Sequence, residues 1–206
     1  MRADWTPIPG GALDLLLWGG FQVGDWGALD HRAWAGAAEI GFQPTGMAKL
    51  RPWIRAGVFE GSGDDDPTDG THGTFFPVLP TPRVYARFPF FNLMNLEDLF
   101  ASLILRPGSR VTLRADARAL GLSEPADLWY AGGGAYDKET FGFGGRPTGG
   151  AEELATLLDL SAEMRFTPRV TVTAYIAHAD GGNVIERIYP QGSTARLGYL
   201  EIELRK

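Results

Sequence analysis

Apolar and polar residues alternate with a period of two along several stretches of this chain. In RVTLRADARAL, which begins at Arg110, valine, leucine and alanine take one face, and threonine, arginine and aspartate take the other. LLDLSAEMRF, from Leu157, and YLEIEL, from Tyr199, repeat the pattern. Because only an extended strand places successive side chains on opposite faces, each of these stretches predicts a β-strand.

The same alternation, clearer in some segments than in others, predicts eight strands in all. In chain order they are LDLLLWGGFQVGDW, HRAWAGAAEIGF, LRPWIRAGVFE, LFASLILRP, RVTLRADARAL, LLDLSAEMRF, RVTVTAYIAHA and YLEIEL. Their apolar faces mix leucine with many alanines and glycines, whereas their polar faces carry charges deep within the strand. A strand of a membrane barrel, apolar toward lipid and polar toward the interior, has this composition.

The connections between these strands alternate between short and long, apart from a modest turn near Gly27 that falls on the long side. PTGM, RPGS and TPR have the residues of tight turns, whereas residues 61–93, 121–153 and 181–194 are long stretches rich in glycine, proline and aspartate. We therefore predict an all-β fold: an antiparallel up-and-down transmembrane β-barrel of about eight strands, with short periplasmic turns and long extracellular loops. Residues 1–206 are expected to form this single barrel domain. A soluble barrel or sandwich, with apolar faces inward and charges in water, is the alternative.

Composition narrows the classes of function. The chain has 206 residues and a net charge of −6, which gives no basic field for nucleic acid. It has no cysteine, so disulfides and thiolate metal sites are excluded. No catalytic motif for a hydrolase or nucleotide site occurs, and the three histidines are far apart in sequence and expected at different strand heights, so we expect no enzyme. No signal peptide is evident, which places any export signal on a longer precursor.

Several segments resemble, in order and spacing, a known family. They are SGDDDPTDGTHGTFFPVLPT, NLEDLFASLILRPGSRVTLRADARAL, DLWYAGGG, LLDLSAEMRFTPRVTVTAYIAHA and YLEIELRK. Together they resemble the C-terminal part of the bacterial alginate export family of outer-membrane β-barrels, over roughly residues 33–206. The resemblance implies a bacterial outer-membrane location and a wider barrel whose arginine-rich lumen passes an anionic uronate polymer. It also implies that this chain supplies only the last strands of such a barrel, as a fragment, a split gene product or a diverged short barrel, with any remaining strands expected from a longer precursor or from partner chains.

Charged residues on the polar strand faces are the candidates for the substrate path. These are Arg51, Arg55, Arg106, Arg114, Asp116, Arg118, Asp159, Glu163 and Arg165. Arginine pairs with carboxylates and stays charged, so a file of arginines offers successive weak sites to a polyuronate or a small anion. The alternative is that the arginines pair across strands with the neighbouring carboxylates and fill the interior.

The segment SGDDDPTDG contains four closely spaced aspartates: Asp64, Asp65, Asp66 and Asp69. Their spacing does not match an EF-hand, which needs glycine at its sixth position and glutamate at its twelfth. A looser Ca²⁺ site is one interpretation of the four carboxylates, and a solvated acidic loop is the other. The phenylalanine- and proline-rich residues that follow are expected to return over the rim of the barrel as a plug.

The predicted function is that of a porin-like channel in contact with outer-membrane lipid, which passes an anionic or polar solute such as an anionic polysaccharide. Two alternatives remain. The first is a small closed outer-membrane barrel that serves as an anchor or as a binding surface through its loops. The second is a soluble ligand-binding β-barrel. Membrane and soluble barrels differ in whether Leu103, Leu113 and Leu160 face outward.

Overall fold

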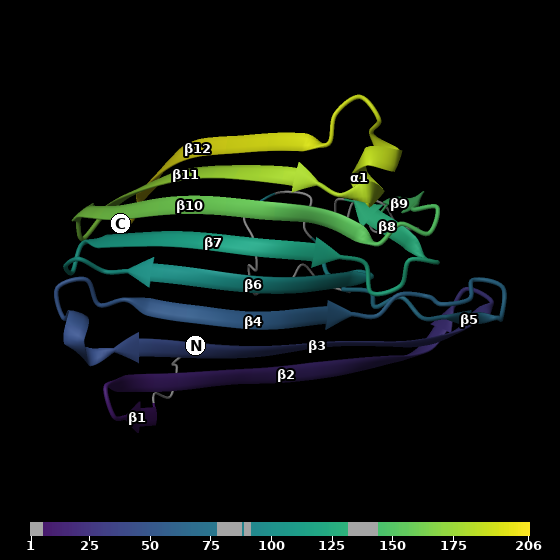
Figure 1. Cartoon of the computed structure of the whole chain (residues 1–206), viewed down its shortest axis with the longest axis horizontal. Coiled ribbons are helices and arrows are strands. Elements are labelled where there is room, and N and C mark those ends of the chain that lie inside the picture. The colour runs from purple at the N-terminus through teal and green to yellow at the C-terminus, as the bar shows by residue number, and fades with distance from the viewer. Residues whose placement is uncertain (1–5, 78–87, 89–91, 132–143) are drawn as a thin grey trace.

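One antiparallel sheet dominates the computed structural model of the chain, which describes residues 6–77, 88, 92–131 and 144–206 (Figure 1). The order of strands along the sheet is β1-β2-β3-β4-β6-β7-β10-β11-β12, with β5 paired to β3. The eight long strands are β2 (Gly11–Trp26), β3 (Leu29–Pro44), β4 (Trp53–Gly61), β6 (Leu96–Leu105), β7 (Val111–Gly121), β10 (Glu153–Thr167), β11 (Val170–Gly181) and β12 (Thr194–Leu204). The all-β, antiparallel meander predicted from alternation is therefore confirmed.

Several short elements were not predicted from the sequence. They are β1 (Thr6–Ile8), the 3₁₀ turn η1 (Thr45–Met47), β5 (Thr71–His72), the separate pair β8 (Leu128–Ala131) and β9 (Gly144–Pro147), and α1 (Asn183–Ile188). Each is too short to show a periodic pattern, and β5 pairs in parallel with β3 only because the loop before β6 folds back on the sheet. Among the described residues no helix is long and apolar enough to cross a membrane.

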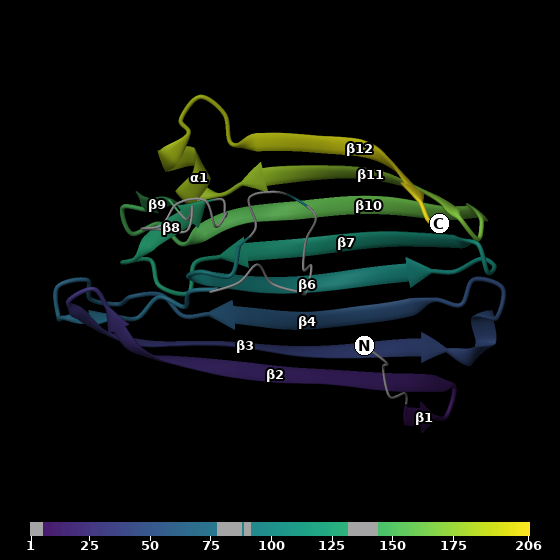
Figure 2. The same cartoon turned by 180° about the vertical axis from the view of Figure 1, so that it is seen from behind.

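The connections divide between the two ends of the sheet (Figures 1 and 2). β5, β8, β9 and α1 lie at the end with the long connections, whereas the opposite end has short turns. The turn between β2 and β3 is the exception, because it contains only two residues and lies at the long-loop end. Gly27 occupies a left-handed conformation there, with φ of 65°, which glycine adopts without steric cost.

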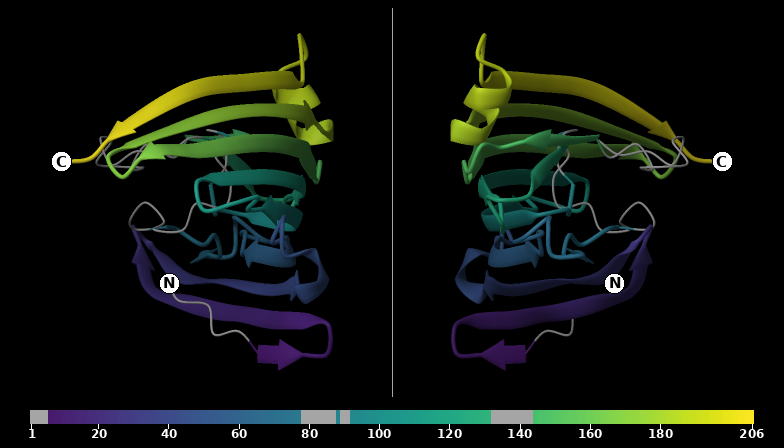
Figure 3. Two further views of the ribbon diagram at one scale, coloured as in Figure 1. Left: turned by 90° about the vertical axis from the view of Figure 1, so that its left-hand side faces the viewer. Right: turned by 90° about the vertical axis from the view of Figure 1, so that its right-hand side faces the viewer.

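The described strands do not close into a barrel. β12 pairs with β11, and β2 pairs with β1 and β3, but β2 and β12 do not pair with each other. In the end-on views they lie at opposite extremes of the sheet (Figure 3). The predicted closed barrel of eight strands is thus not found. Alternation within a strand does not reveal closure, because closure depends on how far the sheet curves between its first and last strand.

The two faces of the sheet differ in chemistry. We call the face with Glu39, Asp116 and Tyr175 the inner face; its central side chains are mostly buried. The outer face carries large exposed apolar side chains, among them Leu103, Leu113 and Leu160, which are 40%, 38% and 52% exposed. The three leucines that separate the membrane from the soluble interpretation therefore face outward.

Two apolar clusters cover parts of the inner face. The larger lies toward the long-loop end, where Phe59 and Leu120 of the sheet pack with Trp129 and with Val184 of α1. The second joins Phe88 to Leu157 and Tyr175 of β10 and β11. Long connections therefore fold inward onto the sheet. The predicted plug falls mostly on residues 78–87, which lie outside the described residues.

Candidate functional site

A layer of charged side chains crosses the inner face at mid-height. We call it the ionic layer; it consists of Asp14, Glu39, Arg55, Asp98, Ser102, Arg114, Asp116, Arg118 and Asp159. Strand register explains its shape. Asp14, Gly41, Arg55, Ser102, Asp116 and Asp159 are successive register partners from β2 to β10. Because register partners lie directly opposite each other, this row places its polar side chains side by side.

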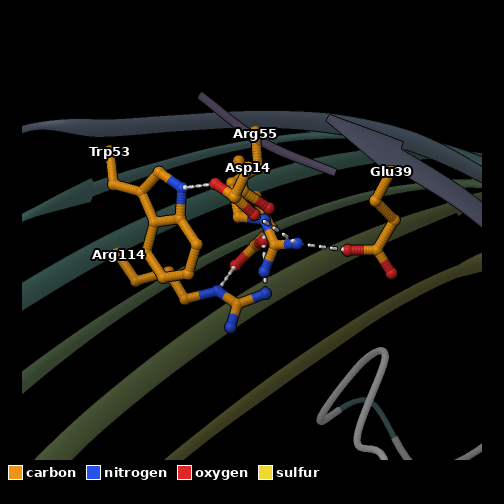
Figure 4. Close-up of polar contacts among 7 residues, drawn as sticks. Asp14, Glu39, Trp53, Arg55 and Arg114 are labelled. Atoms are coloured by element: carbon orange, nitrogen blue, oxygen red, sulfur yellow. Dashed lines mark hydrogen bonds and ion pairs between the residues drawn. The ribbon is translucent and has the colours of Figure 1, made fainter. Parts of the chain in front are cut away.

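At the β2–β4 end of the layer, Arg55 lies between two carboxylates (Figure 4). Its Nη2 is 2.7 Å from Glu39 Oε2 and 3.6 Å from Asp14 Oδ1. Trp53 Nε1 donates a hydrogen bond of 3.0 Å to Asp14 Oδ2, and the Arg55 guanidinium lies 4.5 Å from the Trp53 ring centroid. Gly41 makes room for this contact, because a Cβ there would lie 2.5 Å from Trp53 Nε1 and would overlap Asp14.

At the β6–β10 end, two arginines make ion pairs of different accessibility. Arg114 Nε and Nη2 donate to the two carboxylate oxygens of Asp116, at 2.5 and 2.7 Å, and the Arg114 side chain is 39% exposed. Arg118 pairs with Asp98, and their side chains are only 2% and 0% exposed. Arg114 is therefore accessible from the interior space, whereas Arg118 is enclosed.

The structure separates the candidate path residues into two groups. Arg55, Arg114, Asp116, Arg118 and Asp159 belong to the ionic layer. The other four lie toward the short-turn end: Arg51, Arg106, Glu163 and Arg165.

Two of these four are turn residues. Arg51 precedes β4, with φ of 43°, and its Nε donates to the carbonyl of Arg106 at 3.0 Å. Arg106 follows β6, and its guanidinium lies 5.4 Å from the Trp53 ring. Arg51 and Arg106 therefore join two short turns to each other rather than standing on strand faces.

Sequence analysis did not nominate Asp14, Asp98 and Ser102 as site residues, although all three are buried in the ionic layer. Asp14 interrupts the apolar run LDLLLW, and this interruption was the available signal. A single acidic residue within an otherwise apolar run of a strand marks a side chain that needs a polar partner where it is buried.

The four loop aspartates do not converge. Asp66 accepts hydrogen bonds from the backbone N–H and the hydroxyl of Thr68, and Asp69 accepts from the N–H of Thr71. Asp64 is buried, and desolvation raises its pKa above the usual value, whereas Asp65 is exposed. Among the described residues, no group of three or more histidine and acidic side chains is arranged to hold a metal ion. The Ca²⁺ site stays a prediction.

Two of the three histidines lie together, contrary to the expectation that all three sit at different heights. His31 Nδ1 is 2.9 Å from His72 Nδ1 at the long-loop end of the sheet. His178 is on β11, in register with Arg196 of β12. The loop that carries His72 brings it to β3, which no period along the chain could predict.

Comparison with protein families identifies one match. The family described as "Alginate export" matches residues 1–198, so the similarity begins well before residue 33, where the sequence resemblance was placed, and includes β1 and β2. A comparison with curated proteins finds no match to the chain.

Proposed function

This chain belongs to the alginate export family, and we propose that it forms part of the wall of an outer-membrane channel that passes an anionic or polar solute. The observation that carries this proposal is the inverted distribution of side chains on the sheet. Leu15, Phe21 and Leu200 on the outer face are 67%, 87% and 68% exposed, while Glu39 and Asp98 on the inner face are 2% and 1% exposed.

The outer face supports a position in lipid. Monomeric soluble proteins rarely expose contiguous apolar patches larger than a few hundred Å². Here large apolar side chains are exposed on all eight long strands, from Leu15 on β2 to Leu204 on β12. Outer-membrane strands have this arrangement, since hydrocarbon surrounds one side and polar groups line the other.

The inner face supports passage of a polar solute. Charges of both signs are exposed there, including Arg114 at mid-height and Glu201 and Glu203 on β12. Paired charges bind a passing ion more weakly than isolated ones, and transport requires sites that release what they bind. The family description points to a uronate polymer as the solute and supports transport as the function.

Among the described strands, the outer edge of β12 has no partner and that of β2 pairs only with β1, over Gly11–Leu13, and these open edges support a wider channel. In hydrocarbon, an unpaired strand edge leaves backbone N–H and C=O groups without partners, which costs several kcal/mol for each group. We infer that further strands pair with these two edges in the membrane. Strands of a longer precursor and strands of partner chains would both be able to pair with these edges.

The position in lipid can be tested with two adjacent residues. Leu160 faces outward and is 52% exposed, whereas Ser161 is on the inner face. In lipid vesicles, Leu160→Arg should lower the free energy of unfolding by about 2–4 kcal/mol near the midplane, because the charge meets hydrocarbon. Ser161→Arg is the matched control and should cost less than half as much. Equal or reversed losses would contradict a lipid-facing outer surface.

The channel itself is tested through ion selectivity in planar bilayers. Arg114→Glu reverses an accessible charge on the inner face and should lower the preference for anions, measured as a reversal potential. Arg196→Glu makes the same change of charge on the outer face and should leave selectivity unchanged. Unaltered selectivity in both variants would count against a solute path along the inner face.

A further inference from the structure

Two histidines form a buried pair at the long-loop end of the sheet. His31 lies on β3, and His72 forms β5 within the acidic loop, which we define as residues 62–77. Each is 9% exposed, and their Nδ1 atoms are 2.9 Å apart. The backbone supports the contact, because β5 pairs in parallel with β3 and Asp30 N donates to Gly70 O at 3.0 Å.

Hydrogen bonds from Gln22 and from the backbone of the acidic loop orient the pair. Phe76 fixes the Gln22 amide, since Gln22 Nε2 donates to Phe76 O at 2.5 Å and Gln22 Oε1 accepts from Phe76 N at 2.8 Å. Gln22 Oε1 also lies 3.2 Å from His31 Nε2, so Nε2 is the donor. His31 Nδ1 lies 3.1 Å from the carbonyl oxygen of His72 and 2.9 Å from His72 Nδ1. A hydrogen bond between the two facing Nδ1 atoms needs a proton on one of them and a lone pair on the other.

Packing holds the two rings in contact. Trp26 stacks on His72 with ring centroids 4.4 Å apart and an angle of 4°. When both rings are protonated, each of the two facing Nδ1 atoms carries an N–H, so two donors and two positive charges meet at 2.9 Å. Such a contact is repulsive, and the surrounding rings leave little water to screen it.

The charged groups near the pair come from β3, the acidic loop and the segment after β7. β2 contributes the neutral side chains of Gln22 and Trp26 instead. Asp127 of the segment after β7 is the carboxylate whose charge acts on His72, and Asp64 and Tyr130 contact Asp127. Along the chain, Asp30 precedes His31 on β3 and Asp69 precedes β5 in the acidic loop. Asp127 accepts hydrogen bonds from Asp64 N at 3.0 Å and Thr74 Oγ1 at 2.6 Å, and so holds the base of the loop independently of the histidines.

We propose that the His31–His72 pair is a pH-sensitive latch, which holds the tip of the acidic loop against β3 while His72 is neutral and releases it when both rings are protonated. Asp127 keeps the base of the loop in place, so release frees residues 65–72 without unfolding the sheet. The latch joins the most distinctive loop of the chain to the rim of the sheet, and it does not depend on what the chain transports.

The direction of the pH dependence follows from His72. Desolvation by burial, and then the charge of His31, lower the pKa of His72 below its ordinary value of 6.5, while Asp127 partly opposes this. The latched state therefore binds fewer protons than the released state. Latching is fully favoured above pH 6.5 and weakens as the pH falls below it, roughly tenfold for each pH unit until latched His72 is itself protonated.

A spin label on the loop tests the latch in the full chain, folded in detergent micelles. The chain has no cysteine, so Asp65→Cys gives a single labelling site at an exposed position of the tip. The mobile component of the nitroxide spectrum should grow as the pH is lowered from 8 to 5. In His72→Gln, which keeps an acceptor but cannot titrate, this growth should disappear. His178→Gln is the matched control and should behave like the parent.

Two results would overturn the latch: a spectrum independent of pH in the parent, or an unchanged transition in His72→Gln, which would assign release to carboxylates such as Asp64. If the spin label in His72→Gln is mobile at every pH, the imidazole ¹⁵N chemical shifts of the parent decide whether the latch exists. Coupled titration of the two rings, with the second protonation accompanying release of the loop, supports the latch. Independent titration of the two rings refutes it.

Discussion

Replacing Arg118 by leucine should destabilise the chain far more than the same change at Arg114. The Arg118 and Asp98 side chains are 2% and 0% exposed, so the variant leaves a carboxylate enclosed without its cation. Breaking a buried ion pair from one side costs about 3–5 kcal/mol. Arg118 also lies 4.8 Å from the Phe100 ring, and this contact is lost with it. The Arg114 side chain is 39% exposed, and its partner Asp116, which is 4% exposed, keeps a hydrogen bond from the Ser102 hydroxyl, so the loss at Arg114 should be smaller.

The assay is equilibrium unfolding by urea of the full chain in detergent micelles, followed by tryptophan fluorescence. The double variant Asp98→Leu with Arg118→Leu provides the internal control, because two apolar groups in place of a buried ion pair are often neutral or stabilising. It should recover most of the stability that Arg118→Leu alone loses. Equal losses at Arg118 and Arg114, or a double variant that loses the sum of both single changes, would refute the view that Arg118–Asp98 is an enclosed pair.

Two further predictions concern other parts of the sheet and loop. Gly41→Ala should destabilise the chain and remove the hydrogen bond from Trp53 Nε1 to Asp14, because the added Cβ would overlap the Asp14 carboxylate. Gly19→Ala, whose nearest neighbouring atom is 3.7 Å away, should be neutral in the same urea assay. Calorimetric titration of the acidic loop with Ca²⁺ should give no binding tighter than about millimolar, because Asp66 and Asp69 already accept hydrogen bonds within the loop. A heat of Ca²⁺ binding with micromolar affinity, lost in Asp66→Asn, would contradict this prediction.

The strands and their faces were predictable because both depend on neighbours in sequence. A period of two places Asp116 and Arg118 on one face whatever their partners are. The ionic layer was predictable only in part, since its pairs depend on register between segments far apart. Arg55 and Ser102 are opposite each other although a long connection separates β4 from β6. No local pattern indicates that Arg118 meets Asp98 rather than another acid.

Contacts made by turns and loops were likewise not predictable from the local sequence. Arg51 fits the alternation of LRPWIRAGVFE, yet the proline that follows it is not part of β4, which begins at Trp53. The left-handed conformation of Arg51 directs its side chain to the neighbouring turn instead. Likewise, the contact between His31 and His72 exists because a loop returns to the strand, and such a return leaves no period in the sequence.

The unpaired edge of β12 has a consequence for the biogenesis of the chain. Among the described strands, none pairs with its outer side, so a row of backbone donors and acceptors beside exposed Leu200 and Leu204 is available to any other extended segment. In water, such an edge on an apolar sheet promotes aggregation. With the sheet in the membrane as proposed, insertion that coincides with strand pairing would keep this edge covered. Folding first and inserting afterwards would expose the edge for the whole interval between the two steps.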